Sequence, residues 1–414
     1  MTESFSTLRV NADRMLASFI QLALIGATGD GGVSRATFSE AHLAARKWFQ
    51  KEIESSGFEF RMDGAGNHSA FLNCGSKAAA TLLFGSHLDS VPNGGRFDGA
   101  LGVMAALEVL RTVKENGSRL RVNLEAIDFT DEEGTHVSLL GSTALAGHLR
   151  YDALQKPYGG REKIAGGMAR AGLTDESMLR AGRSKESIAG YLELHIEQGK
   201  RLEHAGIDIG IVSAIVGYGS YRLSFIGRAD HAGSTSMEDR LDAGQGAGAF
   251  ILAAREIVMR DFPNCVANVG KIDFAPGASN IVPVRADLML EFRSPDENQL
   301  SRLDRALMEL ANRNAAQFDL KLLVEPFDRH LPNLMSADIQ HIFQRACDVL
   351  GLSSTVLASG AIHDAQSLVD VCPIGMIFVP SVDGASHAPR EFTKWADCVN
   401  GANVLLQTVL QLAM

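Results

Sequence analysis

The sequence predicts an α/β fold: a mainly parallel sheet flanked by helices, with a second α+β domain inserted into the first. Two observations predict it. Short apolar segments of strand character alternate along the chain with longer amphipathic segments, which is typical of helices packed on a parallel sheet. In addition, the chain has 414 residues, which is more than one ordinary hydrophobic core accommodates.

The elements of the first domain follow from apolar spacing. Short apolar runs predict strands, and apolar residues repeated every three or four positions predict helices. We expect strands over residues 81–84, 122–129, 191–196 and 376–379, and helices over residues 99–115, 138–149, 337–350 and 394–412.

The pattern changes over residues 213–327. Two strands are expected to flank Gly217-Tyr218-Gly219, followed by a helix over 242–260, strands over 266–274 and 281–292, a helix over 297–318 and a strand over 321–324. This β-β-α-β-β-α-β order predicts a self-contained α+β unit. The first domain then comprises residues 1–212 and 328–414.

Composition argues against several classes of partner, metal site and location. The formal net charge of −10 argues against a nucleic-acid partner and against an anionic membrane surface, both of which select basic patches. The five cysteines never form a CxxC pair, which favours reduced thiols in the cytoplasm over a disulfide framework or a thiolate metal site. The apolar run over residues 16–27 is too short to span a bilayer.

Candidate site residues begin after the strand over 81–84. His87 and Asp89 stand two positions apart in Gly85-Ser86-His87-Leu88-Asp89, so they share one face, and the carboxylate is available to orient the imidazole. An ordinary strand-end turn explains this pair equally well. Asp98, in the glycine-rich turn before the next helix, is either a helix N-cap or a carboxylate that bridges two cations.

Three consecutive acids, Asp131-Glu132-Glu133, follow the strand over 122–129. The carboxyl ends of strands are where open α/β sheets place their sites. Like charges this close are costly unless a cation neutralises them or a pKa rises. A solvated charge run is the alternative, but it does not usually follow a buried strand directly. Neighbouring glutamates are able to divide the work, one binding metal and one acting as general base.

Two histidines complete the set. His195 lies at the end of the strand over 191–196, and His387 follows the strand over 376–379. Single histidines are usually structural, but here five polar segments each follow or end a predicted strand. Nitrogen and oxygen ligands without thiolate suit zinc, manganese, cobalt or nickel. The sequence therefore predicts two divalent ions held by His87, Asp98, Glu133, His195 and His387.

Seven segments in this order carry a resemblance to a known family: GSHLDSVPNGGRFDGALGV, DEEGTHVSLLGS, ELHIEQG, GRADHAGSTSM, PGASNIVPV, SGAIHDA and IFVPSVDGASHAPREFT. The chain resembles the carbamoylase and allantoate amidohydrolase branch of the dinuclear metallopeptidase superfamily that also contains aminoacylases and carboxypeptidase G. The resemblance covers nearly the whole chain.

The resemblance implies a role for each matching position. His87 and His195 would bind one ion, Glu133 and His387 the other, and Asp98 would bridge them. Glu132 would be the general base, and Asp89 would support His87 from behind. Peptidases of the superfamily typically have a carboxylate where this branch has His195.

Substrate contacts are implied at five further positions: His231, Asn280, Arg293, Gln198 and Gly360. Arg293 offers a planar fork for a substrate carboxylate, although a structural salt bridge is an even alternative for an arginine on a strand. His231 would donate a hydrogen bond to a developing oxyanion and is implied as catalytic; a capping or exposed histidine is the alternative.

Near the expected substrate-binding residues, the sequence differs from the pattern that is usual in this branch. Ser234 and Ser236 replace a threonine and a proline, Ile362 replaces a glycine, and Thr135-His136 stands where serine-arginine is common. None of these positions is an expected metal ligand, so the departures point to a difference in specificity.

The resemblance therefore implies a homodimeric amidohydrolase that cleaves a carbamoyl or other linear amide C–N bond in a small carboxylate-bearing substrate, such as an N-carbamoyl-L-amino acid or allantoate. The inserted domain would be its lid and dimer surface. The cysteine pattern favours a cytoplasmic location. An N-acyl amino acid deacylase or dipeptidase is the alternative among enzymes. A catalytically inactive, metal-stabilised binding protein is the alternative from another class, and the presence of Glu132 argues against it.

Overall fold

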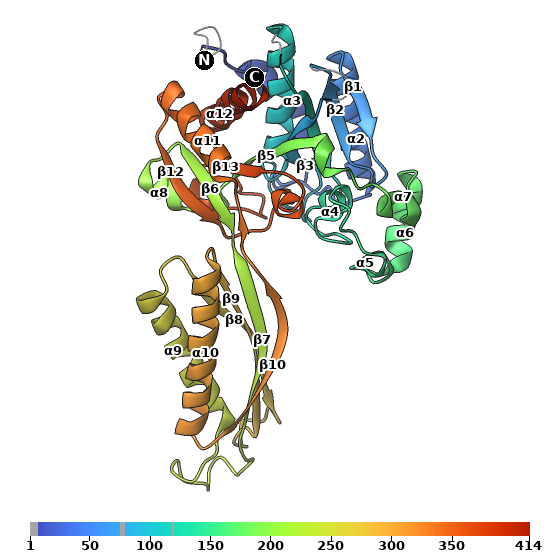
Figure 1. Cartoon of the computed structure of the whole chain (residues 1–414). Helices are drawn as coiled ribbons and strands as arrows, with labels where there is room; N and C mark the ends of the chain where they lie inside the picture. The colour runs from blue at the N-terminus through green and yellow to red at the C-terminus, as the bar shows by residue number, and fades with distance from the viewer. Residues whose placement is uncertain (1–6, 75–78, 118–119) are drawn as a thin grey trace. The chain divides into compact units, whose positions relative to one another are not determined.

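The computed structural model describes residues 7–74, 79–117 and 120–414, and the chain divides into two compact units (Figure 1). The first unit comprises Met1–Ser213, Leu334–Leu357 and Ala361–Met414, and the second comprises Ala214–Asn333 with Ala358–Gly360. The roles of lid and dimer surface stay predictions for the second unit.

A nine-stranded sheet forms the centre of the first unit. Its strands are β1 (Glu59–Met62), β2 (His68–Leu72), β3 (Thr81–His87), β4 (Asn123–Phe129), β5 (Ile188–Ile196), β6 (Ile209–Ile215), β11 (Asn333–Leu334), β12 (Ser354–Ser359) and β13 (Ile374–Val379). They lie in the order β1-β2-β4-β3-β5-β13-β6-β11, with β12 paired to β6. The four expected strands are present as β3, β4, β5 and β13.

The sheet is mixed, so the expectation of a mainly parallel sheet is wrong for the outer strands. β4, β3, β5 and β13 run parallel, whereas β2 pairs with β4 and β6 pairs with β13 in antiparallel fashion. The parallel strands are buried on both faces, which explains their continuous apolar sequences. Their carboxyl ends meet at one edge of the sheet.

Helices cover this sheet. They are α1 (Ala12–Ala23), α2 (Glu40–Ser55), α3 (Ala100–Glu115), α4 (Leu140–Leu145), α5 (Tyr151–Gln155), α6 (Arg161–Arg170), α7 (Asp175–Leu179), α8 (Arg201–Ala205), α11 (Ala337–Leu350) and α12 (Trp395–Ala413), with short 3₁₀ turns at Lys185–Ser187, Asp364–Leu368 and Val382–Gly384. α3 packs on β3, β4 and β5, and α12 packs on α3 and β13. Every residue of α3 from Ala100 to Val113 is buried, so this helix lies inside the main core. The helix expected over 138–149 is shorter, because Leu139 before it and Gly147 after it have positive φ.

The second unit contains a four-stranded antiparallel sheet in the order β10-β7-β9-β8. Its elements are β7 (Gly217–Ile226), α9 (Ala243–Asp261), β8 (Val266–Ala275), β9 (Arg285–Ser294), α10 (Glu297–Gln317) and β10 (Lys321–His330). The expected pair of strands flanking Gly217-Tyr218-Gly219 is wrong, because these residues lie inside β7 and the preceding strand, β6, belongs to the other sheet. β9 begins later than expected, and β10 extends to His330.

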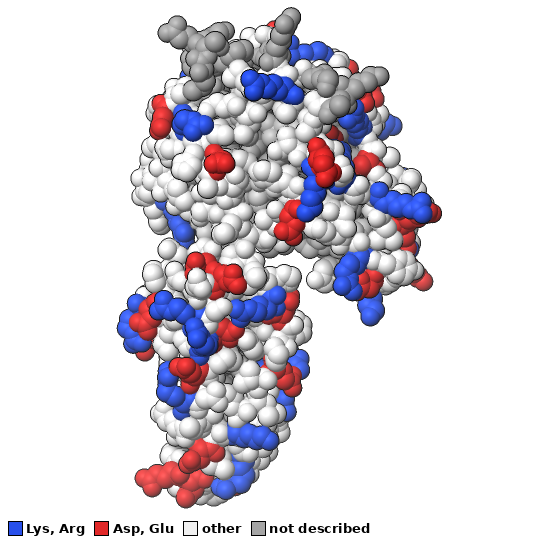
Figure 2. Space-filling view, viewed as in Figure 1, with Lys and Arg blue, Asp and Glu red and all other residues white. Residues whose placement is uncertain are grey.

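Alternation along β9 explains how the second unit is built. Ala286, Leu288, Leu290 and Phe292 are buried under α9 and α10, while the residues between them lie on the opposite, more exposed face. On the face of the molecule shown in Figure 2, Lys and Arg side chains stand among Asp and Glu side chains. Within the described ranges, no helix is both long and apolar enough to cross a membrane.

Candidate metal centre and active site

The carboxyl ends of three neighbouring parallel strands supply most of the candidate site. His87 ends β3, Glu132 and Glu133 follow β4, and His195 lies one residue before the end of β5. Asp98 comes from the turn before α3. Gly99, at the start of that helix, has φ of 61°, and a Cβ there would lie 2.4 Å from the His87 ring. Only glycine therefore lets this turn approach the histidine.

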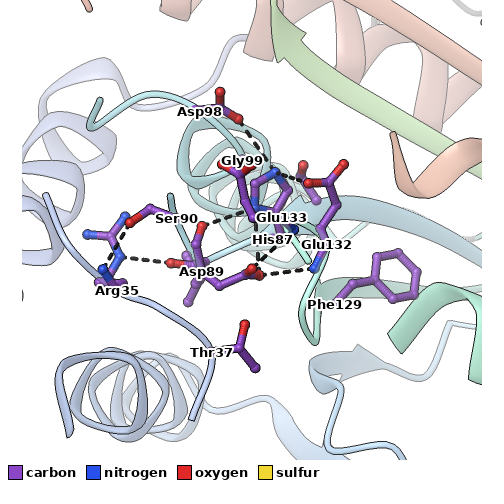
Figure 3. A network of polar contacts seen from close by, with 12 residues as sticks. Arg35, Thr37, His87, Asp89, Ser90, Asp98, Gly99, Phe129, Glu132 and Glu133 are labelled. Carbon is purple, nitrogen blue, oxygen red and sulfur yellow. Dashed lines mark hydrogen bonds and ion pairs between the residues drawn. The ribbon is translucent and has the colours of Figure 1, made fainter. Parts of the chain in front are cut away.

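The first ligand cluster consists of His87, Asp98 and His195, all buried. Asp98 Oδ1 lies 3.1 Å from His195 Nε2 and 3.6 Å from His87 Nε2. Figure 3 shows Asp98 and Glu132 both directed at the Nε2 atom of His87. The N-cap alternative for Asp98 is wrong, because Gly99 is the N-cap of α3 and receives no side-chain cap.

The second cluster shares Asp98 with the first. Asp98 Oδ2 lies 3.5 Å from His387 Nε2, which in turn lies 3.6 Å from Glu133 Oε2. The two oxygens of one carboxylate thus face two different clusters. This is the arrangement that a carboxylate bridging two cations requires.

Backbone carbonyls fix the tautomer of two histidines. His87 Nδ1 donates to the carbonyl of Asp89 (3.1 Å), and His195 Nδ1 donates to the carbonyl of Ile196 (2.9 Å). When the ring is neutral, a proton on Nδ1 leaves the lone pair on Nε2, which is the atom that faces Asp98 in both residues. Such an arrangement orients histidine ligands in metal sites.

The side chain of Asp89 contacts a different partner from the one expected. Its oxygens accept hydrogen bonds from the backbone N–H groups of Glu132 (3.3 Å) and Glu133 (3.2 Å), whereas its Oδ1 lies 3.8 Å from His87 Nδ1 (Figure 3). Asp89 therefore supports His87 through its backbone carbonyl, and its carboxylate fixes the turn that carries the two glutamates.

Ionised carboxylates that are buried close together are energetically unfavourable unless a cation neutralises their charge. Burial and the nearby charge of Asp98 raise the pKa of Glu133 to about 8, and burial with the charges of Asp364 and Glu133 raises the pKa of Glu132 well above its usual range. Burial opposes ionisation of Asp98, but His195 and His387 hold its pKa well below the usual range. The alternative of a solvated charge run is wrong, because Asp131 and Glu132 are buried.

The donor set fits divalent ions. Glu133 Oε1 is buried and has no hydrogen-bond partner among the described residues, so its lone pairs are available for a cation. Three imidazole nitrogens and two carboxylates, without thiolate, match zinc, manganese, cobalt or nickel.

A cavity of about 190 Å³ opens onto both clusters. Its lining residues all belong to the first unit: Asp98, Glu132, Glu133, Ser138, His195, Gln198, Ala361, Ile362, His363 and His387. Sequence reasoning did not identify Ser138 or His363 as part of this wall. Ile362, which departs from the resembled branch, does lie in it.

The remaining predicted residues belong to the second unit. His231 is exposed, and its Nδ1 accepts from the backbone N–H of Gly233 (3.0 Å) and of Ser234 (3.2 Å). Its proton is therefore on Nε2, where it is available to a ligand. The Asn280 carbonyl accepts from Ala232 N–H, which places Asn280 beside His231.

Arg293 already has two protein partners. Its Nε pairs with Glu291 (2.8 Å), and its Nη1 donates to the carbonyl of Gly360 (2.7 Å). Gly360, expected as a substrate contact, is here an anchor for Arg293. The arginine is about one-third exposed (36%), so part of its fork remains accessible.

Comparison with known proteins finds relatives that match nearly the whole chain. Residues 83–411 match the model of peptidase family M20/M25/M40. The chain is 36% identical to N-carbamoyl-L-amino acid amidohydrolase of Geobacillus stearothermophilus, over 98% of this chain and 99% of that protein. It is 30% identical to allantoate amidohydrolase of Bacillus subtilis, with the same coverage.

A solved structure from Burkholderia multivorans, described as an amidase of the hydantoinase/carbamoylase family, superposes with a TM-score of 0.90 at 32% identity, covering 98% of this chain and 99% of that one. The family match includes every candidate metal ligand, from His87 to His387. The full-length relatives extend the likeness over both units. The chain is thus a member of peptidase family M20/M25/M40.

Proposed function

We propose that this protein is a metal-dependent amidohydrolase that cleaves a carbamoyl or other linear amide C–N bond in a small carboxylate-bearing substrate. The observation that supports this most is the pair of ligand clusters that share Asp98 and lie beside the buried Glu132. Two of the relatives named above are an N-carbamoyl-L-amino acid amidohydrolase and an allantoate amidohydrolase, and they match both units of the chain.

In this proposal the clusters would hold two divalent ions. His87 and His195 would bind one and Glu133 and His387 the other, with Asp98 available to both. Ions bound there supply Lewis-acid polarisation of a carbonyl and lower the pKa of water.

Glu132 is the proposed general base. It projects into the cavity next to the clusters, and Asp89 fixes its backbone. Burial, with the charges of Asp364 and Glu133, raises the pKa of Glu132 in metal-free protein. Cations bound beside it would favour its ionised form, which could accept a proton from water and return it to the leaving nitrogen. Its neighbour Glu133 faces His387 instead, so the two glutamates have different roles.

The second unit is proposed to bind the rest of the substrate. His231 presents an Nε2–H donor suited to an oxyanion, and Asn280 lies next to it. The accessible part of Arg293 is proposed to pair with the substrate carboxylate, with Glu291 and Gly360 holding the guanidinium in place.

The substrate proposal is tested by a hydrolysis screen. Protein loaded separately with zinc, manganese, cobalt or nickel is assayed on N-carbamoyl-L-amino acids, allantoate, ureidoglycolate, N-acyl amino acids and dipeptides. We expect turnover of a ureido substrate. Turnover confined to N-acyl amino acids or dipeptides would contradict the proposal, and so would inactivity on every compound with a fully metal-loaded protein.

Replacing Arg293 with lysine keeps the charge but removes the planar fork, so we expect turnover of a carboxylate substrate to fall. Wild type and variant are compared on a carboxylate substrate and on its neutral amide. Wild type should prefer the carboxylate strongly, and the variant should lose that preference. If the folded variant keeps the preference, Arg293 is only the partner of Glu291 and Gly360.

Metal binding is expected to release protons. Contact with Asp98 raises the pKa of His387 to about 9; for His195, burial lowers the pKa but Asp98 outweighs it and raises the value to about 9. With Glu133 at about 8, all three groups carry a proton at pH 7 in metal-free protein. Metal needs their lone pairs, so affinity should rise from pH 6 to pH 9.

Calorimetric titration with zinc, in buffers of different ionisation enthalpy, measures this release. We expect at least about three protons per chain at pH 7, one from each of these groups, and ionisation of Glu132 adds to this number. Titrations with no buffer dependence would show that the three groups are not ligands.

We also propose a homodimer formed through the second unit. β8 is an edge strand with the exposed apolar side chains Val266, Ile272 and Phe274, and α9, which packs beside it, exposes Leu252 and Met259. Exposed apolar edges favour pairing with another chain. Sedimentation should show a dimer that Ile272→Lys weakens, and a monomeric wild type would contradict the proposal.

A further inference from the structure

Three polar side chains surround Asp98 on the side away from the first cluster. Gln198 Nε2 donates to Asp98 Oδ2 at 2.7 Å and lies 3.1 Å from Ser386 Oγ. Ser386 Oγ lies 2.9 Å from Asp98 Oδ2 and 3.0 Å from Glu391 Oε2. Gln198, expected as a substrate contact, is therefore occupied with a candidate metal ligand.

Glu391 contacts both ends of Asp98. Its Oε1 accepts from the backbone N–H groups of Phe97 (2.9 Å) and Asp98 (3.1 Å), and its Oε2 reaches the Asp98 carboxylate through Ser386. Room for it comes from Gly95, where a Cβ would lie 1.9 Å from the Glu391 carboxylate. Glu391 is only 1% exposed, and a buried carboxylate is tolerated only where hydrogen bonds satisfy it.

Gln198 and Ser386 contact only one of the two carboxylate oxygens of Asp98. Oδ1 is the atom near His87 and His195, whereas Oδ2 is the atom near His387 and also the one that Gln198 and Ser386 contact. A carboxylate free to rotate would not keep one oxygen in each cluster. The hydrogen bonds on Oδ2 fix the plane of the carboxylate.

We propose that Glu391 is a positioning residue that, through Ser386 and with Gln198, holds Asp98 Oδ2 toward Glu133 and His387. It thereby sets the affinity of the second cluster for its ion, while the first cluster depends on it much less. This inference rests on the proposed two-ion function, and it concerns Glu391 and Ser386, which belong to neither ligand cluster and do not line the cavity.

Metal titration of the Glu391→Ala variant tests the proposal. Alanine removes both acceptor oxygens, so the backbone N–H groups of Phe97 and Asp98 and the Ser386 hydroxyl all lose this partner, whereas glutamine would still be able to donate to the Ser386 hydroxyl. Zinc is titrated against a competing chelator of known affinity. We expect the first ion to bind nearly as in wild type, and the second to bind about 10- to 100-fold more weakly, as for other supporting contacts of metal ligands.

Two variants of Ser386 make the test independent of the folding of the Glu391 variant. Ser386→Ala removes the link and should show the same selective loss at the second ion. Ser386→Thr keeps the hydroxyl and should restore most of the affinity. High metal concentration should restore turnover to Ser386→Ala, since Glu132 and the ligands themselves are unchanged.

Asp63→Asn is a matched control. The Asp63 carboxylate likewise accepts from two backbone N–H groups in a turn, those of Ala65 (2.9 Å) and Asn67 (3.0 Å), but it contacts neither cluster. We expect it to lower the free energy of unfolding without changing metal affinity.

The positioning role alone would be overturned if the folded Glu391→Ala and Ser386→Ala variants both bound the two ions with wild-type affinity. Equal weakening of both ions would assign these residues to general support of the fold and also overturn it. A wild type that binds a single ion would contradict the two-ion function and this inference together.

Discussion

Replacing Glu132 with glutamine is expected to lower kcat by about 10²- to 10⁴-fold, the usual contribution of a general base, while metal content stays nearly intact. The amide keeps the size of the side chain but cannot accept the proton from water. Glu132 Oε2 lies 3.5 Å from His87 Nε2, outside the two ligand clusters, so its loss leaves the ligand set complete.

The neighbouring residue, Glu133, provides the comparison for the Glu132 variant. Glu133→Gln removes a charged ligand of the second cluster, so it should reduce bound metal first and lose activity as a consequence. Steady-state kinetics with elemental analysis of both variants separates the two roles. If Glu132→Gln loses metal and Glu133→Gln keeps it, the two assignments are reversed.

Replacing Asp98 with asparagine should have a second large effect, because this residue alone belongs to both clusters. Asparagine keeps the shape but offers one acceptor oxygen, and its other terminal atom is a donor that repels a cation. We expect at most one ion per chain and activity at the level of metal-free protein. Asp63→Asn again serves as the control for folding.

The Asp98→Asn variant is tested by elemental analysis after gel filtration, with turnover measured on the same sample. Two retained ions with wild-type kcat would show that Asp98 does not bridge. One retained ion with near wild-type kcat would show that a single cluster suffices for catalysis.

The strands that carry the site were predictable because they are central. β3 and β4 are buried on both faces, so their sequences are continuous apolar runs that end where His87 and Glu132 begin. β1, with a half-exposed sequence, and the short β11 have no such signal. β6 is apolar and almost fully buried, so its sequence indicates a strand but not which of the two sheets it joins.

The expected metal ligands come together because parallel strands end at the same edge of a sheet. Glu391 gave no comparable signal: it follows no strand directly, and its role arises from contact with residues 293 and 294 positions away. Asp364 was missed for a similar reason, since only the fold places its charge near Glu132. Such partners depend on tertiary approach rather than on local sequence.

The central claim, that two ions bound to this site carry the activity, is tested most directly by metal reconstitution. Chelator-treated protein is titrated with zinc, manganese, cobalt or nickel, and bound metal and hydrolysis of the ureido substrate found in the screen are measured at each step. We predict no activity without metal, two ions per chain at saturation, and turnover that rises with the second ion. Full activity in protein shown by elemental analysis to contain no metal would contradict the account.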